Sequence, residues 1–414
     1  MKRFFRIFAS FATLLCTIIM GFIIYVCNHV PTEYQSVTDT DVEIKCYMPL
    51  KAKKVYTVDS VNTTSNNISG KASYNANLML MGSIPVKNVN VETVEETKVT
   101  PCGTPFGIKI FTKGVVVIGM TNVQTSNGML NPALEAGLRE GDVIVEVNDQ
   151  QVNSNEEFAN IIQNNGESEI KLSVLRDNVT IETLLTPVKS CLDNTYKIGL
   201  WVRDSSAGIG SLTFYNEDTG DFAGLGHGIC DVDTGELMPL MHGDIVKAHI
   251  AGITKGEKGN PGELKGYFSD YNPIGTLSAN TNTGIYGTLN SAPIDNEKIA
   301  VAMKQQVKTG SAKVLTTISG ETPDYYEIEI TNVNYNENCP TKNMVITIKD
   351  ERLLEATGGI VQGMSGSPII QDGKLVGAVT HVFINDSKKG YGIFAETMLK
   401  NSQDYHIKDQ QKAA

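Results

Sequence analysis

The chain has 414 residues, a formal net charge of −11 and 41% hydrophobic residues. This length suits about two or three domains, and this apolar content is enough for buried cores, which excludes a wholly disordered chain. Because phosphate backbones repel an acidic chain without a basic stripe, nucleic acid is excluded as a partner. The 38 glycines indicate many turns and therefore a mainly β fold.

An uncharged segment near the N-terminus predicts a membrane helix. Three basic residues precede residues 7–27, which match the roughly 20 apolar residues that cross a bilayer. The basic flank should stay in the cytoplasm and the remainder should be exported. A cleavable signal peptide is the alternative, but the run is long for one and no A-x-A-like site follows it. We therefore expect residues 1–28 to form a cytoplasmic flank and an uncleaved transmembrane anchor.

Residues 29–98 are predicted to be a linker or N-terminal region without chemistry of its own. Residues 57–77 are rich in Ser, Asn and Thr, which is typical of a linker or a flexible loop. Residues 89–94 alternate apolar and polar side chains, which predicts a half-buried strand.

Residues 99–190 are predicted to form the next domain. The segment A-x-x-A-G-L-x-x-G-D-x-I-x-x-V-N at residues 133–148 predicts a short helix, a turn and a strand, and residues 156–163 predict an amphipathic helix. This pattern resembles a PDZ domain of the kind fused to bacterial proteases. Such a domain keeps a sheet edge open beside a helix, where an extended peptide can add as a strand.

The peptide-binding loop of this domain is expected at Phe106, Gly107 and Ile108. Free N–H groups of such a loop could hold a terminal carboxylate. The sequence departs from the usual Gly-Leu-Gly-Phe loop, so recognition of a free C-terminus stays open. The alternative is a structural module that only docks onto its neighbour.

Residues 191–414 are predicted to form a β-barrel or sandwich, because short apolar strands alternate with Gly, Asn and Asp turns. No long amphipathic helix is expected there. The predicted strands are residues 198–202, 210–214, 313–318, 326–330, 344–348 and 375–379.

The stretch Gly-Met-Ser-Gly-Ser-Pro at residues 363–368 carries the predicted chemistry. A serine hydroxyl needs a base to take its proton and donors to hold an oxyanion. The glycines permit a sharp turn in which the N–H groups of Gly363 and Ser365 converge. Chymotrypsin-like peptidases use the same G-x-S-G-x-P arrangement. A strand, a hairpin turn at residues 371–374 and a return strand follow, so we expect Ser365 to be the nucleophile.

Six histidines are available as the base. His227 is favoured, because its Gly-Leu-Gly-His-Gly-Ile setting permits close approach of another group. His381 follows the return strand near Ser365 and stays open as the alternative. His29 adjoins the membrane segment, and His406 lies in a predicted polar tail.

Three segments together resemble the stage IV sporulation protein B peptidases of spore-forming Firmicutes: residues 208–214, 224–229 and 357–369. The order of membrane segment, PDZ domain and peptidase is also that of this family. The resemblance implies a catalytic Ser365, His227 as base and Asp350 as the acid that orients it. It also implies self-processing, and cleavage of a membrane-bound regulator of a sporulation sigma-factor pathway, in the space between forespore and mother cell.

Other positions stay open for the acid. Only 15 residues separate Asp350 from Ser365, far fewer than in chymotrypsin-like enzymes. Asp231, Asp233 and Asp244 lie nearer to His227 in sequence. Asp350 also precedes a segment for which it could act as a helix N-cap.

We therefore expect a mainly β, membrane-tethered serine endopeptidase with a PDZ domain and a chymotrypsin-like β-barrel. Its partners are a protein substrate, itself as substrate and the membrane. The alternative is a catalytically inactive scaffold that binds a membrane partner. Gly359 stands where basic-specific relatives of chymotrypsin carry Asp, so a trypsin-like preference is not expected.

No metal or organic cofactor is expected. The seven cysteines form no CxxC pair, which argues against a zinc site and a disulfide framework. A bridge between Cys102 and Cys191, at the two ends of one predicted domain, stays open because pairing cannot be read from sequence.

Overall fold

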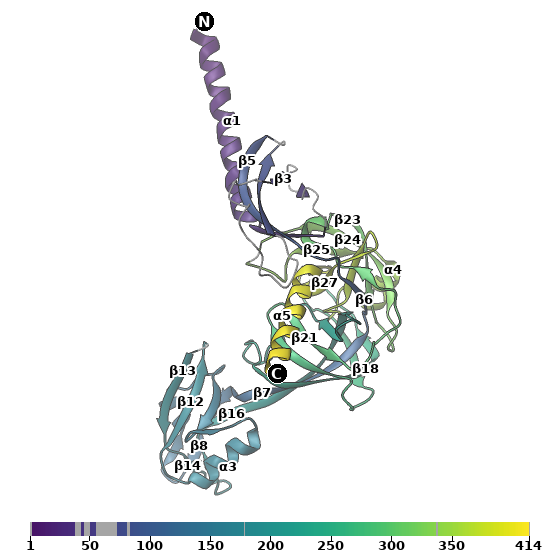
Figure 1. Ribbon diagram of the computed structural model, residues 1–414. Helices are drawn as coiled ribbons and strands as arrows, with labels where there is room; N and C mark the ends of the chain where they lie inside the picture. The colour runs from purple at the N-terminus through teal and green to yellow at the C-terminus, as the bar shows by residue number, and fades with distance from the viewer. Residues whose placement is uncertain are drawn as a thin grey trace.

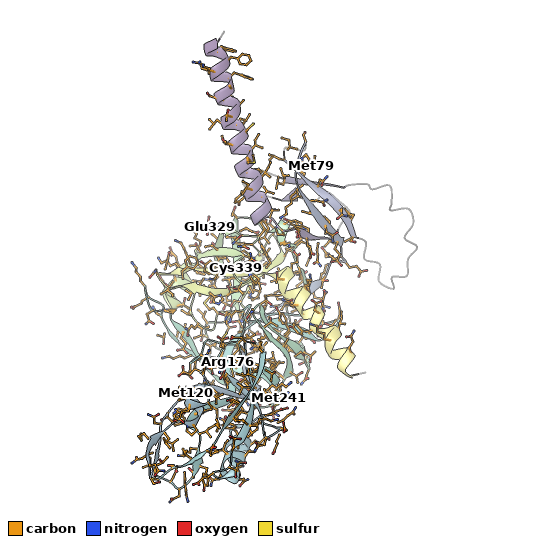
Figure 2. The ribbon with its side chains drawn as sticks, turned by 90° about the vertical axis from the view of Figure 1, so that its left-hand side faces the viewer. Met79, Met120, Arg176, Met241, Glu329 and Cys339 are labelled. Carbon is orange, nitrogen blue, oxygen red and sulfur yellow. The ribbon has the colours of Figure 1, made fainter. Side chains whose placement is uncertain are left out.

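The structure is a computed structural model that describes residues 2–37, 43–44, 50–54, 73–80, 83–177, 179–336 and 338–413. Helix α1 (Lys2–His29), a small sheet, a body of two barrels and a third unit follow one another along the molecule (Figure 1). Figure 2 shows the same order from the side, with Met79 in the small sheet below α1 and Cys339 in the barrel body.

Helix α1 is the predicted apolar segment. Its stretch Phe4–Val26 has a mean hydropathy of 2.4, and the apolar window of 18 residues within it is not buried by the rest of the protein. A helix of this length and composition can cross a bilayer, and a signal sequence meets the same criterion. Only its C-terminal end packs on the protein, where Val26 and Val30 are buried.

A five-stranded sheet occupies the region expected to be a linker. Its order is β1-β5-β4-β3-β2. Part of the linker prediction is therefore wrong: residues 73–77 lie in β4, and residues 57–72 fall outside the described residues. The strand predicted at residues 89–94 is confirmed within β5. The bounds are β1 (Glu33–Ser36), β2 (Glu43–Ile44), β3 (Leu50–Lys54), β4 (Ser73–Leu80) and β5 (Ile84–Thr93).

The first barrel is a ring of six strands that encloses buried aromatic and aliphatic side chains such as Phe106, Phe222 and Ile245. The strands pair in the order β7-β18-β20-β21-β17-β16, and an additional β7–β16 pairing closes the ring. The bounds are β7 (Pro105–Met120), β16 (Leu200–Tyr215), β17 (Asp221–Gly224), β18 (Leu240–Thr254), β20 (Gly275–Thr281) and β21 (Gly284–Leu289). Shorter strands flank it: β6 (Lys98–Pro101), β19 (Glu263–Phe268) and β22 (Ile299–Ala300).

The second barrel closes in the order β23-β24-β25-β28-β27-β26. A 3-10 turn, η2 (Lys304–Gln306), precedes it. The hairpin predicted behind Ser365 is confirmed, with Asp372 and Gly373 both at positive φ in its turn. The bounds are β23 (Gly310–Thr316), β24 (Asp324–Val333), β25 (Met344–Ile348), α4 (Glu351–Thr357), β26 (Pro368–Gln371), β27 (Lys374–Phe383) and β28 (Asp386–Phe394).

Helix α5 (Ala395–Ala413) contradicts the expectation that residues 191–414 contain no long helix. It packs through Met398 and Leu399 on both barrels. Its His406, predicted to lie in a polar tail, places Nδ1 2.9 Å from Asp221 of β17. A few apolar side chains are enough to hold α5 on the barrels because polar contacts such as this one also join the helix to them.

The third unit is inserted in the sequence between the end of β7 and the start of β16, two strands that pair with each other. The end of β7 pairs with β10 and the start of β16, whereas its first half, with β6, belongs to the first barrel. The expected boundary at residue 99 therefore falls within the barrel sheet. The bounds are β8 (Val123–Thr125), β9 (Gly128–Leu130), α2 (Pro132–Glu135), β10 (Val143–Val147), β11 (Gln150–Gln151), α3 (Asn155–Asn165), β12 (Ile170–Arg176), β13 (Val179–Leu185), β14 (Val188–Lys189) and β15 (Tyr196–Lys197).

Because the third unit is inserted between β7 and β16, we expect a deletion of residues 99–190 and a replacement of residues 113–203 to give different results. Removing residues 99–190 takes β6 and all of β7 from the first barrel, so the product should not fold. Replacing residues 113–203 by Asn-Gly should leave a folded body, because Thr112 Oγ1 donates to the Asp204 carbonyl at 3.0 Å and the two cut ends are adjacent. Circular dichroism melts of both products test this. A cooperative melt of the first deletion would contradict the inserted arrangement.

Candidate active site

The predicted nucleophile lies in a loop between α4 and β26. Helix α4 ends at Gly358, whose φ of +75° is the left-handed conformation that favours glycine. Gly363 and Gly366 also have positive φ, +95° and +93°. These glycines turn the chain twice within four residues, and Ser365 lies between the turns.

Strand β16 of the first barrel holds this loop. The Ser211 hydroxyl donates to the Gly363 carbonyl at 2.9 Å, and the Ser211 N–H donates to the Ser365 carbonyl at 3.0 Å. The hydroxyl of Thr213 donates to the Gly366 carbonyl at 2.7 Å. A Cβ at Gly366 would lie 2.0 Å from the Ser211 carbonyl oxygen, so only glycine permits this approach.

The Ser365 hydroxyl donates to the Thr380 carbonyl at 2.8 Å. No hydrogen bond joins it to His227 within the described part of the chain. The N–H groups of Gly363 and Ser365 likewise have no hydrogen-bond partner among the described residues. These are the two donors predicted for the oxyanion hole, and they are free to receive an oxygen from outside the protein.

His227 follows β17 in a loop with a strained backbone, across from the loop that carries Ser365. Leu225 has a φ of +63°, which is rare for a branched side chain, and Gly226 has a φ of +70°. His227 Nδ1 lies 2.8 Å from the Gly228 carbonyl. Because a carbonyl can only accept, Nδ1 carries the proton and Nε2 of the neutral ring keeps its lone pair. That tautomer is the one a general base needs.

His381, the alternative base, lies beside His227 with ring centroids 5.0 Å apart. Burial lowers the pKa of His227 below its ordinary value, while the bond to Gly228 partly opposes this effect. Burial, and then the nearby His227 and Lys342, lower the pKa of His381 to about 4. Both rings are therefore neutral near pH 7.

A cleft of about 630 Å³ brings the predicted groups together. It lies between the loop after β17 and the loop before β26, that is, between the two barrels. Ser365, Gly363, His227 and His381 all line it.

Asp350 is not brought to this cleft. It is the N-cap of α4, and its carboxylate accepts from the backbone N–H groups of Arg352 and Glu327. The Arg352 guanidinium, 3.0 Å away, holds the pKa of Asp350 below its usual range. The position next to His227 Nδ1 is taken by the Gly228 carbonyl. The geometry of this structure therefore does not support Asp350 as the orienting acid.

The alternative acids are also engaged elsewhere. Asp231 and Asp233 both pair with Arg203 of β16, Asp233 at 2.7 Å. Asp244 lies 2.9 Å from Nε2 of His242. The sequence prediction missed the two groups that do contact the side chains of His227 and Ser365, which are the carbonyls of Gly228 and Thr380. Backbone carbonyls carry no residue-type signal, so they could not be found from sequence.

The predicted peptide-binding residues of the inserted unit do not form a loop. Phe106, Gly107 and Ile108 lie in β7 within the first barrel, where both side chains are buried and a Cβ on Gly107 would lie 2.5 Å from Phe268. A groove of about 600 Å³ opens instead between α3 and the start of β16. Its Ile198-Gly199-Leu200 segment, with Gly199 at a φ of +84°, lines one side of the groove.

Cys102 and Cys191 are both free cysteines, so no disulfide joins them. Cys102 is buried in the first barrel and Cys191 is exposed. Within the described residues, no group of three or more His, Cys, Asp or Glu side chains could hold a metal ion.

Comparison with known proteins gives a family. A family model described as SpoIVB peptidase S55 matches residues 194–399, and a PDZ domain model matches residues 131–176. The chain belongs to the SpoIVB peptidase S55 family. It is therefore a serine peptidase that carries a PDZ domain, and the expected mainly β fold with a β-barrel is confirmed.

Three solved structures are similar to parts of this peptidase. The PDZ domain of an SdrC-like protein from Listeria monocytogenes is 21% identical, with a TM-score of 0.18, over 22% of this chain and 87% of that one. The HtrA-type protease AlgW with a decapeptide is 12% identical, with a TM-score of 0.30, over 49% of this chain and 54% of that one. The Rv3671c protease from M. tuberculosis is 15% identical, with a TM-score of 0.27, over 48% and 74%.

The lowered pKa of His227 predicts where the activity of the peptidase falls on the acid side of its pH profile. Only the neutral ring can accept a proton, so activity should fall as pH drops through a pKa below the ordinary value of about 6.5. Stability should decline over the same range, because the unfolded chain binds a proton at His227 that the buried ring resists. The rate of labelling by a fluorophosphonate across pH 4–8 measures the limb.

A His381→Gln variant is the control for this profile. Because His381 is neutral above about pH 4, its removal should leave the midpoint in place. A midpoint above pH 7 in the unmodified enzyme would contradict the desolvated state of His227.

Proposed function

We propose that this peptidase is a membrane-tethered serine endopeptidase with Ser365 as nucleophile and His227 as general base. The observation that carries the proposal is the shared cleft, where Ser365, neutral His227 and two unpartnered N–H groups converge between the barrels.

The reaction follows from these groups. The Ser365 hydroxyl leaves the Thr380 carbonyl, gives its proton to His227 Nε2 and bonds to the substrate carbonyl carbon. The oxyanion accepts from the Gly363 and Ser365 N–H groups. When the C–N bond breaks, His227 returns the proton to the leaving amine. Water then attacks the acyl-enzyme, with His227 again taking and returning the proton, which releases the acid and frees Ser365.

The Gly228 carbonyl fixes His227 in this proposal. It accepts the Nδ1 proton, sets the tautomer and stabilises the imidazolium as a dipole rather than as a full charge. Asp350 acts at a distance as a positioning residue: it caps α4, and the C-terminal end of α4 leads directly into the nucleophile loop.

The PDZ domain and α1 support a proposal about the partners and the location of the enzyme. A peptidase with a PDZ domain has a protein substrate, and the groove beside α3 is suited to an extended segment of it or of a regulator. The family name supports a sporulation role. We infer an anchor at α1, an exported catalytic body between forespore and mother cell, self-processing within residues 28–98, and cleavage of a membrane-bound regulator of a sigma-factor pathway.

A Ser365→Ala variant tests the nucleophile. It should abolish both fluorophosphonate labelling and N-terminal self-processing, because loss of the nucleophilic serine lowers kcat about 10⁶-fold in serine peptidases. Mass spectrometry of the purified full chain reads both events. Ser205→Ala, at an exposed serine of β16 outside the cleft, is the matched control and should behave as the unmodified enzyme.

Two results would decide against this assignment. Continued self-processing in purified Ser365→Ala protein would show another nucleophile or a contaminating peptidase. Absence of labelling in the folded, unmodified chain would favour the alternative, an inactive scaffold that binds a membrane partner.

An Asp350→Asn variant separates the two roles considered for this residue. Asn caps helices about as well as Asp, so we expect labelling within about threefold of the unmodified rate. Asp350→Ala removes the cap and should lower stability by about 1 kcal/mol in a thermal melt. If Asp350→Asn stays folded but labels about 10⁴-fold more slowly, Asp350 orients His227 as the family resemblance implies.

A further inference from the structure

The cleft around Ser365 is lined without any charged side chain. None of its lining residues in the described chain is Asp, Glu, Lys or Arg, although the whole chain carries a net charge of −11. Its two histidines are neutral near pH 7 for the reasons given above. Lys342 acts on His381 from outside this lining, and the uncharged lining itself indicates what the cleft receives.

Aliphatic side chains form the walls that adjoin the nucleophile. Ile360 and Val361 precede it by a few residues, Val382 lies on β27 beyond Thr380, and Ile384 lies in the turn that follows β27. Ile209 of β16 and Ile229 of the His227 loop close the other side. An acyl group on Ser365 therefore has apolar surface on both sides.

Hydrogen bonds hold this wall in place. The Gln362 N–H donates to the Gly262 carbonyl at 2.8 Å, and the Leu264 N–H donates to the Gln362 carbonyl at 2.9 Å. The Ile360 N–H donates to the Ser387 carbonyl at 2.7 Å. The subsite is thus formed before a substrate arrives, which reduces the entropy that binding must offset.

The strand edge beside the wall is open to a substrate. Beyond Val379, β27 pairs only with β28 in the described residues, at Val382 and Phe383. An extended peptide can add along the free edge and place its carbonyl over Ser365. Two exposed side chains continue the apolar surface at the rim: Ile384 is 66% exposed and Val232 is 84% exposed. Exposed apolar groups at the rim of a site mark a surface that a partner covers.

We propose that this cleft selects an aliphatic or aromatic side chain for the residue on the acyl side of the scissile bond. The inference rests on the proposed nucleophile Ser365. A charged side chain at that position would lose its hydration without gaining a partner, which disfavours it strongly. An apolar one gains by burial against the Ile and Val side chains.

Peptidyl diphenyl phosphonates test the preference on the full chain without knowledge of the natural substrate. The serine oxygen bonds to phosphorus, one P–O bond to phenoxide breaks, and His227 takes the serine proton. A matched series carries Val, Leu, Phe, Lys or Glu side chains next to phosphorus. We expect second-order labelling at Ser365 to be at least about 10-fold faster for the apolar members, as a hydrophobic pocket discriminates.

An Ile384→Asp variant sharpens the test. It should slow labelling by the Leu and Phe probes severalfold and raise the relative rate of the Lys probe, because a carboxylate then stands at the rim. Ile407→Asp is the matched control, since Ile407 is 54% exposed on α5 away from the cleft, and it should change neither rate.

The outcomes distinguish a failure of the proposed apolar preference from a failure of Ser365 as the proposed nucleophile. Fluorophosphonate labelling at Ser365 together with faster labelling by the Lys or Glu probe would overturn the apolar preference and leave the peptidase intact. Equal rates for all five probes would overturn it as well. Failure of every probe, including the fluorophosphonate, would instead refute the proposed nucleophile.

Discussion

The position of Ser365, the proposed nucleophile, depends on hydrogen bonds from a strand of the first barrel. Ser365 belongs to the second barrel, yet Ser211 and Thr213 of β16 hold the carbonyls on either side of it. These hydroxyls are buried, so breaking either bond would leave a desolvated polar group, which costs about 1–3 kcal/mol. The missing Cβ of Gly366 is what permits the approach. The cleft around Ser365 exists because these contacts join the two barrels at one point.

The same strand connects the cleft to the PDZ groove. Leu200 and Trp201, at the start of β16, line the groove beside α3. Arg203 follows and pairs with Asp231 and Asp233 in the loop after His227. Farther along, Ser211 contacts the nucleophile loop. One continuous strand thus contacts the PDZ groove, the loop of the base and the loop of the nucleophile, in that order. An insertion within the barrel sheet makes this possible, whereas a domain attached by a linker would not.

The parts that could be predicted are those with a local signal. The glycine-flanked Ser365, the hairpin behind it and the alternating strands of residues 313–379 each follow from turn chemistry or periodicity. Helix α5 was missed because its polar face dominates its sequence, while its burial depends on the barrels it covers. The first half of β7 was assigned to the PDZ unit because chain order suggests contiguous domains. Only the pairing of Ile108 with Ile245 and Ile209 with Gly107 shows which sheet it joins.

Burial accounts for several properties of the cleft at once. Removing water from His227 lowers its pKa and leaves the ring neutral, which is the form that can accept a proton. The same low polarity strengthens the interaction between an oxyanion and the N–H groups of Gly363 and Ser365. It also makes a charged substrate side chain costly to bind. The protonation state of His227, the proposed oxyanion stabilisation and the proposed substrate preference are therefore linked here: a polar substitution in the cleft wall that admits water should raise the pKa of His227 towards its ordinary value and weaken the other two.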